Sequence, residues 1–246
     1  MFSESDRARV RASLLDRAEG DARIVAAAIT GSAALDAEDR WSDVDLAFGV
    51  AASADRDEVI ADWTRTLERE FRTVHHWDLP SMESLFRVFL LPDGLEVDIS
   101  FTPETAFGAY TPRFKLVFGS SRELPTPGRR PGRELVGYAW HHALHAHASI
   151  ARGESWQAVQ LISILRGNVF ALACTRLGLP AAVWKGFDAL PPELRERLEP
   201  SLVASLAAAE LRRALSICTE ALLDEIAHDD PQLASALASP LGVCIV

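Results

Sequence analysis

Apolar residues in the first half of the chain recur at two spacings, one helical and one typical of strands. Residues 4–19 and 55–71 repeat apolar positions every three to four residues, as amphipathic helices do. Residues 23–30 and 44–50 are short apolar runs with the length of buried strands. Two further strands lie within residues 85–101 and are joined by Pro-Asp-Gly, so they predict a hairpin.

The pattern changes after about residue 120. The segment 120–132 contains three prolines and two glycines and predicts a linker. Beyond it no strand pattern persists, and the spacing predicts helices near 133–151, 154–178, 192–199 and 201–228. We therefore expect an α+β protein, with a mixed β-sheet flanked by helices over residues 1–120 and an α-helical domain over residues 121–246.

Charge and cysteine content limit the cellular compartment and the classes of binding partner that we expect. The formal net charge of −10 disfavours non-specific binding to nucleic acid and suits a cationic small molecule. Three cysteines lie far apart in the chain, as expected of buried thiols in a reducing compartment. The N-terminus has no apolar core of a signal peptide, and no uncharged run approaches the roughly 20 residues that cross a bilayer. We expect a cytoplasmic protein that does not enter the membrane.

Three acidic residues fall where strands are expected. Asp43 and Asp45 stand two apart at the start of the second strand, so both side chains project from one face. The strand over 95–101 alternates strictly, which places Asp98 and Glu96 on its polar face. If these two strands are neighbours, three carboxylates converge.

Converging carboxylates repel one another unless a cation lies between them. Oxygen ligands at this density suit Mg²⁺, which keeps several waters and is completed by substrate phosphates. Gly31 and Ser32 directly follow the first strand. A glycine there lets the backbone approach a phosphate, and the Ser32 hydroxyl can bond a phosphate oxygen.

Each motif alone has an ordinary interpretation. An isolated Asp-x-Asp is usually a solvated loop or a helix cap, a Gly-Ser is common turn chemistry, and one aspartate on a strand is often a surface residue. The set in this order and structural context is much more specific, and we interpret it as catalytic.

The segment GSAALDAEDRWSDVDLAF resembles the signature of the DNA polymerase beta nucleotidyltransferase superfamily, and the resemblance covers roughly residues 20–102. A helical domain after it is similar to the arrangement in nucleotidyltransferases that modify aminoglycosides or lincosamides. The resemblance implies the nucleotidyltransferase fold, triphosphate contacts from Gly31 and Ser32, and metal binding by Asp43, Asp45 and Asp98. Many small members carry an arginine shortly after the Gly-Ser, where this chain has Ala33-Ala34-Leu35.

The charge of a triphosphate then needs another partner, and two cationic residues of the helical half are candidates. Arg166 falls within the apolar stripe of the helix near 154–178, so it needs either a triphosphate or a carboxylate. Lys185 lies in a loop beside Trp184 and can contact phosphate or lie over a base; the alternative is an ordinary surface loop.

The expected reaction is transfer of NMP, by preference AMP from ATP, to a hydroxyl of a small polar molecule, with release of pyrophosphate. An aminoglycoside-type acceptor fits the acidic charge. The general base is Asp98 or Glu96, with other carboxylates as alternatives: Glu104, Glu134 and Asp188.

Two rival functions remain open. One is a nucleotidyltransferase that acts on tRNA or on a protein of a toxin–antitoxin pair. A basic stripe would favour tRNA, and the sequence offers Arg122, Arg129, Arg130 and Arg133. The other rival is a non-catalytic nucleotide-binding regulatory module.

Overall fold

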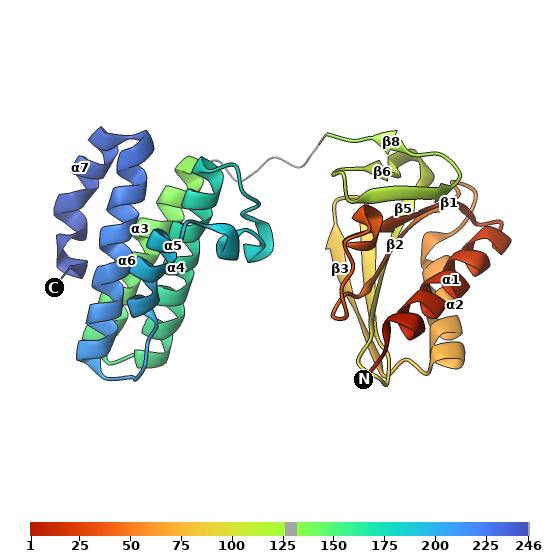
Figure 1. Ribbon diagram of the computed structural model, residues 1–246, viewed down its shortest axis with the longest axis horizontal. Helices are drawn as coiled ribbons and strands as arrows, with labels where there is room; N and C mark the ends of the chain where they lie inside the picture. The colour runs from red at the N-terminus through yellow and green to blue at the C-terminus, as the bar shows by residue number, and fades with distance from the viewer. Residues whose placement is uncertain (126–131, 246) are drawn as a thin grey trace. The chain divides into compact units, whose positions relative to one another are not determined.

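The computed structural model describes residues 1–125 and 132–245 and divides into two compact units (Figure 1). The N-terminal unit spans residues 1–127 and the C-terminal unit spans residues 128–246. The expected boundary lay between residues 120 and 121. Residues 126–131, inside the expected linker, lie outside the described residues.

The N-terminal unit contains every element that the hydrophobic pattern predicted, together with some that it missed. Its helices are α1 (Glu4–Gly20) and α2 (Arg56–Phe71). Its strands are β1 (Ile24–Thr30), β2 (Val44–Val50), β3 (His75–Ser81), β4 (Ser84–Leu90), β5 (Glu96–Pro103), β6 (Gly108–Ala109), β7 (Phe114–Phe118) and β8 (Arg122–Glu123). The missed strands are β3, β6, β7 and β8, the last of which falls within the expected linker.

Six strands form one mixed sheet in the order β3-β4-β5-β2-β1-β7, and β6 pairs with β8 in a separate two-stranded sheet. The expected hairpin is present as the antiparallel pair β4–β5. The pair β2–β5 is parallel, whereas β1 runs antiparallel to β2. The starts of β2 and β5 therefore meet the end of β1 at one end of the sheet.

Both helices pack on the same face of this sheet (Figure 1). Their apolar stripes, with Leu14 of α1 and Trp63 of α2 among the most buried residues, meet alternate residues of the strands such as Phe48 and Phe101. In a strand the intervening residues point the other way. The polar residues of β2 and β5 therefore lie on the face opposite the helices.

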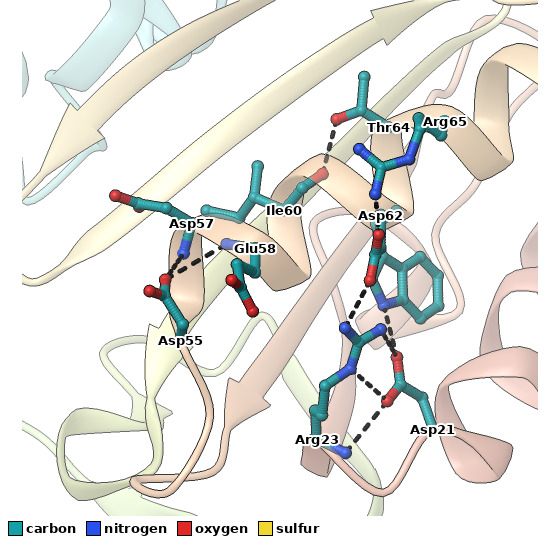
Figure 2. Close-up of polar contacts among 10 residues, drawn as sticks. Asp21, Arg23, Asp55, Asp57, Glu58, Ile60, Asp62, Thr64 and Arg65 are labelled. Atoms are coloured by element: carbon teal, nitrogen blue, oxygen red, sulfur yellow. Dashed lines mark hydrogen bonds and ion pairs between the residues drawn. The ribbon is translucent and has the colours of Figure 1, made fainter.

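Side-chain capping fixes the starts of both helices, and an ion-pair bridge fixes α2 to the beginning of β1. Ser3 forms a capping box with Asp6 at the start of α1. Asp55 accepts two backbone N–H bonds at the start of α2, and Arg23 bridges Asp21 and Asp62 (Figure 2). This bridge joins the beginning of β1 to α2, so strand and helix are held in one relative position.

The C-terminal unit is helical, as expected. Its α-helices are α3 (Gly132–Arg152), α4 (Ser155–Arg176), α5 (Pro192–Leu198), α6 (Ala208–Asp229) and α7 (Pro231–Leu241). The helix expected over 201–228 begins only at Ala208, and α7 was not expected.

By length and composition alone, α4 is apolar enough to cross a membrane. Its residues Ile162, Leu165 and Val169 are fully buried in the core of the helical unit. A core helix of a helical bundle has the same properties.

Candidate active site

Asp45 and Asp98 are direct partners in the parallel pair β2–β5. Neighbouring strands lie about 4.8 Å apart, and partnered residues present their side chains on the same face. The two carboxylates therefore stand side by side on the sheet face opposite the helices. The convergence of carboxylates predicted from the sequence requires β2 and β5 to be neighbours, and they are. The metal-binding role of these residues stays a prediction.

Gly31 lies against the Asp45 carboxylate at the end of β1. Its φ is +66°, a left-handed conformation that favours glycine. A Cβ on Gly31 would lie 1.8 Å from Asp45 Oδ2, closer than any non-bonded contact. Glycine is required here for both backbone conformation and space. Its main chain borders Asp43, Asp45 and Asp98, which we call the acidic cluster.

Asp98 is largely buried, and its Oδ1 atom finds no hydrogen-bond partner among the described residues. Burial, reinforced by the negative charges of Asp45, Asp43 and Glu96, raises the pKa of Asp98 to about 7. An acid with this pKa is partly protonated at neutral pH. In its deprotonated form this carboxylate can therefore either take up a proton or bind a cation.

Asp43 immediately precedes β2, at the end of a loop that is anchored to α1. Arg7 is 4% exposed, and its Nη1 donates to the carbonyl oxygens of Asp39 and Ser42 at 2.6 and 3.1 Å. Its Nε forms an ion pair with Glu38 at 3.0 Å. These contacts hold the segment leading into Asp43. Arg7 was not among the predicted site residues, although Arg7, Val10 and Leu14 share one helical face.

The acidic cluster offers carboxylate oxygens, which are suitable ligands for a divalent cation. Throughout residues 1–125 and 132–245, no three His, Cys, Asp or Glu side chains are arranged as a ready-made metal site. Yet Asp43 and Asp45 both act electrostatically on Asp98, whose Oδ1 lacks a donor within the same residues. A hard cation such as Mg²⁺ would supply the missing positive partner, with water and phosphate oxygens completing its coordination.

Ser32 and Glu96 flank this cluster. Ser32 follows Gly31, and its carbonyl oxygen accepts the backbone N–H groups of Leu35 and Ala37, which folds the segment into a tight turn. Its hydroxyl group makes no capping bond to this turn. Glu96 is exposed at the start of β5, two residues before Asp98 on the same face. Both residues lie where the sequence analysis expected them, and their roles stay predictions.

A pocket of about 270 Å³ opens beside the cluster on the same sheet face. Gly31 and Ala47 line it together with residues that the sequence analysis did not single out, among them Ser100, Tyr110 and Arg113. The segment holding Tyr110 and Arg113 has little hydrophobic periodicity. Only the fold brings it over the strands.

Arg166 and Lys185 belong to the C-terminal unit. Among the described residues, Arg166 donates hydrogen bonds to the Ser201 carbonyl oxygen at 3.1 Å and to the Ser201 hydroxyl at 3.3 Å. It also donates to the Ser163 hydroxyl at 3.3 Å. Arg166 also lines a pocket of about 420 Å³ within this unit, with Asp188 and several other charged residues. Lys185 is exposed beside Trp184, whose φ is +63°.

The remaining sequence candidates are spread over the chain. Glu104 begins a short 3₁₀ turn after β5, Glu134 lies in the first turn of α3, and Asp188 lies in a 3₁₀ turn before α5. Of the suggested basic stripe, Arg122 is exposed in β8 and Arg133 lies at the start of α3. Arg129 and Arg130 lie outside the described residues.

The fold class is thus the expected one: a mixed sheet flanked by helices, followed by a helical unit. No protein-family model and no curated protein matches the chain. Among solved structures it is similar to an aminoglycoside 6-adenyltransferase from Bacillus subtilis, with 16% identity, a TM-score of 0.40 and 99% of both chains covered. It is also similar to the polymerase core of TRAMP, an RNA surveillance complex, with 12% identity and a TM-score of 0.32. That match covers 94% of this chain and 61% of the other.

Proposed function

We propose that this protein is a Mg²⁺-dependent nucleotidyltransferase that transfers NMP, AMP from ATP in the first instance, to a hydroxyl group of a small molecule. The observation that carries the proposal is the pairing of Asp45 with Asp98 across β2 and β5, with Gly31 packed against the Asp45 carboxylate. Carboxylates beside a glycine backbone at one end of a sheet are a fitting site for a metal-bound triphosphate.

In this proposal Asp43, Asp45 and Asp98 hold the Mg²⁺ ions, which would neutralise charge on the transferring and leaving phosphates. The main chain at Gly31 and the hydroxyl of Ser32 orient the triphosphate. The acceptor oxygen attacks the α-phosphorus, the bond to the bridging oxygen breaks, and pyrophosphate leaves. Most of the rate acceleration comes from positioning and charge neutralisation.

The acceptor hydroxyl must release its proton during the attack. Asp98 is the first candidate for the general base when it does not bind the metal, because without a cation burial and the neighbouring carboxylates raise its pKa to about 7. Glu96, two residues away on the same strand face, is the alternative if Asp98 is committed to the metal. In either case the proton moves from the acceptor oxygen to a carboxylate of β5.

We further propose Arg166 and Lys185 as phosphate or base contacts, because the Gly-Ser turn itself supplies no cation. A polycationic, aminoglycoside-type acceptor is the candidate that the net charge of −10 favours. The N-terminal unit holds most of this excess, with 23 Asp and Glu against 14 Lys and Arg in residues 1–127. Such a surface disfavours tRNA as the acceptor.

The test is a transfer assay with the full chain, Mg²⁺, each NTP in turn and a panel of hydroxylated acceptors. Pyrophosphate release together with an acceptor mass gain of one nucleotide is the expected result, abolished in Asp43→Asn and Asp45→Asn. Asp93→Asn, in the exposed turn between β4 and β5, is the matched control and should keep activity. Nucleotide binding without transfer to any acceptor would favour a regulatory module instead.

A further inference from the structure

The pocket beside the acidic cluster is lined by the residues that follow Asp45 and Asp98 along β2 and β5 on the same face. Asp45 and Asp98 form one pair of the β2–β5 ladder, and Ala47 and Ser100 form the next pair on that face. Ala47, Ser100 and Gly31 all line the 270 Å³ pocket. The carboxylates do not themselves line the pocket, but the pocket begins at the next pair on the same face and at Gly31, which packs against the Asp45 carboxylate.

The lining of this pocket differs from the surface around it. Among the described residues that line it there is no acidic side chain; its walls are aromatic, its floor carries hydroxyl groups, and the one charged residue of this set is a cation. The walls are Phe86, Phe107, Tyr110 and Phe114, the hydroxyls come from Thr30, Ser84, Ser100, Thr102 and Thr111, and the cation is Arg113. In a unit with so many acidic residues, a pocket whose described lining carries a cation and no carboxylate is a specific feature.

The apolar character extends beyond the pocket along the sheet. Ser100 is partnered by Phe86 of β4, and Phe86 is partnered by Leu79 of β3. Leu79 is 48% exposed, and its neighbour on the same face, Trp77, is 52% exposed. Trp77, Leu79 and Phe86 form an apolar strip, which leads from the pocket to the edge of the sheet.

We infer that the pocket binds the acceptor, and that this acceptor is an uncharged hydroxylated ring carrying an apolar substituent rather than a polycation. The inference rests on the proposed transferase function, and it replaces the polycationic acceptor that the net charge favours with an uncharged one that the pocket lining favours. A ligand is selected by the groups it touches: the hydroxyl floor can bond sugar-like hydroxyls, the aromatic walls and the apolar strip cover a ring or chain, and Arg113 repels ammonium groups. The net charge of the whole chain attracts polycations to the surface, but it does not offer them a partner in this pocket.

The first test measures binding without NTP or Mg²⁺, so that it does not depend on catalysis. The probes are phenyl β-glucoside, methyl β-glucoside and kanamycin, observed by saturation-transfer NMR with competition. We expect phenyl β-glucoside to bind at least tenfold more tightly than methyl β-glucoside, and kanamycin not to displace it. Displacement by kanamycin, or equal binding of the two glucosides, would overturn the inference.

Variants then locate the binding. Phe86→Ala removes a wall of the pocket, and Ala47→Leu fills its floor; both should weaken phenyl β-glucoside binding at least tenfold. Leu116→Ala, on the exposed part of β7 and outside the lining, is the control and should leave binding unchanged. Equal binding by Phe86→Ala and wild type, with both proteins folded, would place the glucoside elsewhere and refute the assignment.

Transfer assays separate this inference from the proposed function. Nucleotide transfer to kanamycin but not to phenyl β-glucoside would refute the acceptor class and leave the transferase intact. Glucoside binding in the pocket without pyrophosphate release from any NTP would refute the transferase, and with it the role of the pocket as an acceptor site.

Discussion

The carboxylate of Asp45 occupies the space into which a side chain at Gly31 would extend. A Cβ on Gly31 would lie 1.8 Å from Asp45 Oδ2 and 2.7 Å from its Cγ, and the φ of +66° disfavours any other residue independently. The backbone of one strand end and an acidic side chain of the next strand therefore fix each other's position. A substitution at Gly31 must displace the carboxylate, whatever else it does.

Replacing Gly31 with alanine should consequently damage the site more than the fold. We expect Gly31→Ala to lower the free energy of unfolding by about 2–4 kcal/mol, from backbone strain plus the steric overlap, and to abolish Mg²⁺-dependent transfer. The control is Gly94→Ala, which has a φ of +85° but open space around its Cβ. It should lose only about 1 kcal/mol and keep activity. Urea unfolding and transfer assays of both variants check this, and equal effects would contradict the steric argument.

The raised pKa of Asp98 predicts an unusual pH dependence of stability in the metal-free protein. The folded state holds this proton up to about pH 7, whereas the unfolded chain releases it near the ordinary aspartate pKa of 3.8. The contribution of Asp98 to stability is therefore full below pH 4 and is lost as the pH rises to 7, by up to about 1.4 kcal/mol per pH unit. Above pH 7 the loss is complete and the contribution levels off.

Asp98→Asn should remove this dependence and make the metal-free protein more stable than wild type at pH 8. Urea unfolding at pH 5, 6, 7 and 8 in EDTA measures the effect, and excess Mg²⁺ should restore wild-type stability at pH 8. Glu96→Gln, the exposed neighbour, is the control and should change the profile little. Parallel profiles for wild type and Asp98→Asn would show that the carboxyl group titrates normally.

Arg7 should position Asp43 without touching the substrate. Arg7→Ala removes the two bonds to the carbonyl oxygens of Asp39 and Ser42 and the ion pair with Glu38, which keeps its ion pair with Arg11. We expect hydrogen exchange of the amides in residues 38–42 to accelerate at least tenfold, and transfer to need more Mg²⁺. Arg9→Ala, whose side chain is 73% exposed in the same helix, is the control. Unchanged exchange in residues 38–42 would refute this positioning role.

The parts of the fold that the sequence predicted are those with strong periodicity. Strict alternation in β5 placed Asp98 on the polar face, and short apolar runs located β1 and β2. The strand β3 was missed because its sequence, HHWDLPS, is polar and contains a proline, as an exposed edge strand can. Its hydrogen bonds to β4, rather than its own side chains, make it a strand.

The site was predictable in its acidic members and in the Gly31-Ser32 turn beside them. Spacing within a strand places Asp43 and Asp45 together, but which strands become neighbours depends on the whole sheet. The aromatic and hydroxyl lining of the pocket comes from the four strands β1, β4, β5 and β7 and from the segment 107–111, which have no common motif. The apolar positions Val10 and Leu14 marked the buried face of α1, so that burial of Arg7 was detectable, whereas its contacts with the loop before Asp43 were not.

Arg166 either contacts the triphosphate or only stabilises the packing of the helical unit, and a variant that removes its charge separates the two. Its bonds to Ser201 and Ser163 are to neutral oxygens, so an amide can replace part of them, and Arg166→Gln should fold with a loss of about 1–2 kcal/mol. If the guanidinium contacts the triphosphate, this variant raises the KM for the NTP at least tenfold, and Arg166→Lys recovers part of the loss because the positive charge returns. Arg195→Gln is the matched control, because Arg195 lines the same pocket and donates to the carbonyl oxygen of Leu190. We expect its KM to stay near that of wild type. A KM unchanged in Arg166→Gln, together with the lowered stability, would assign Arg166 to the packing of the helical unit alone.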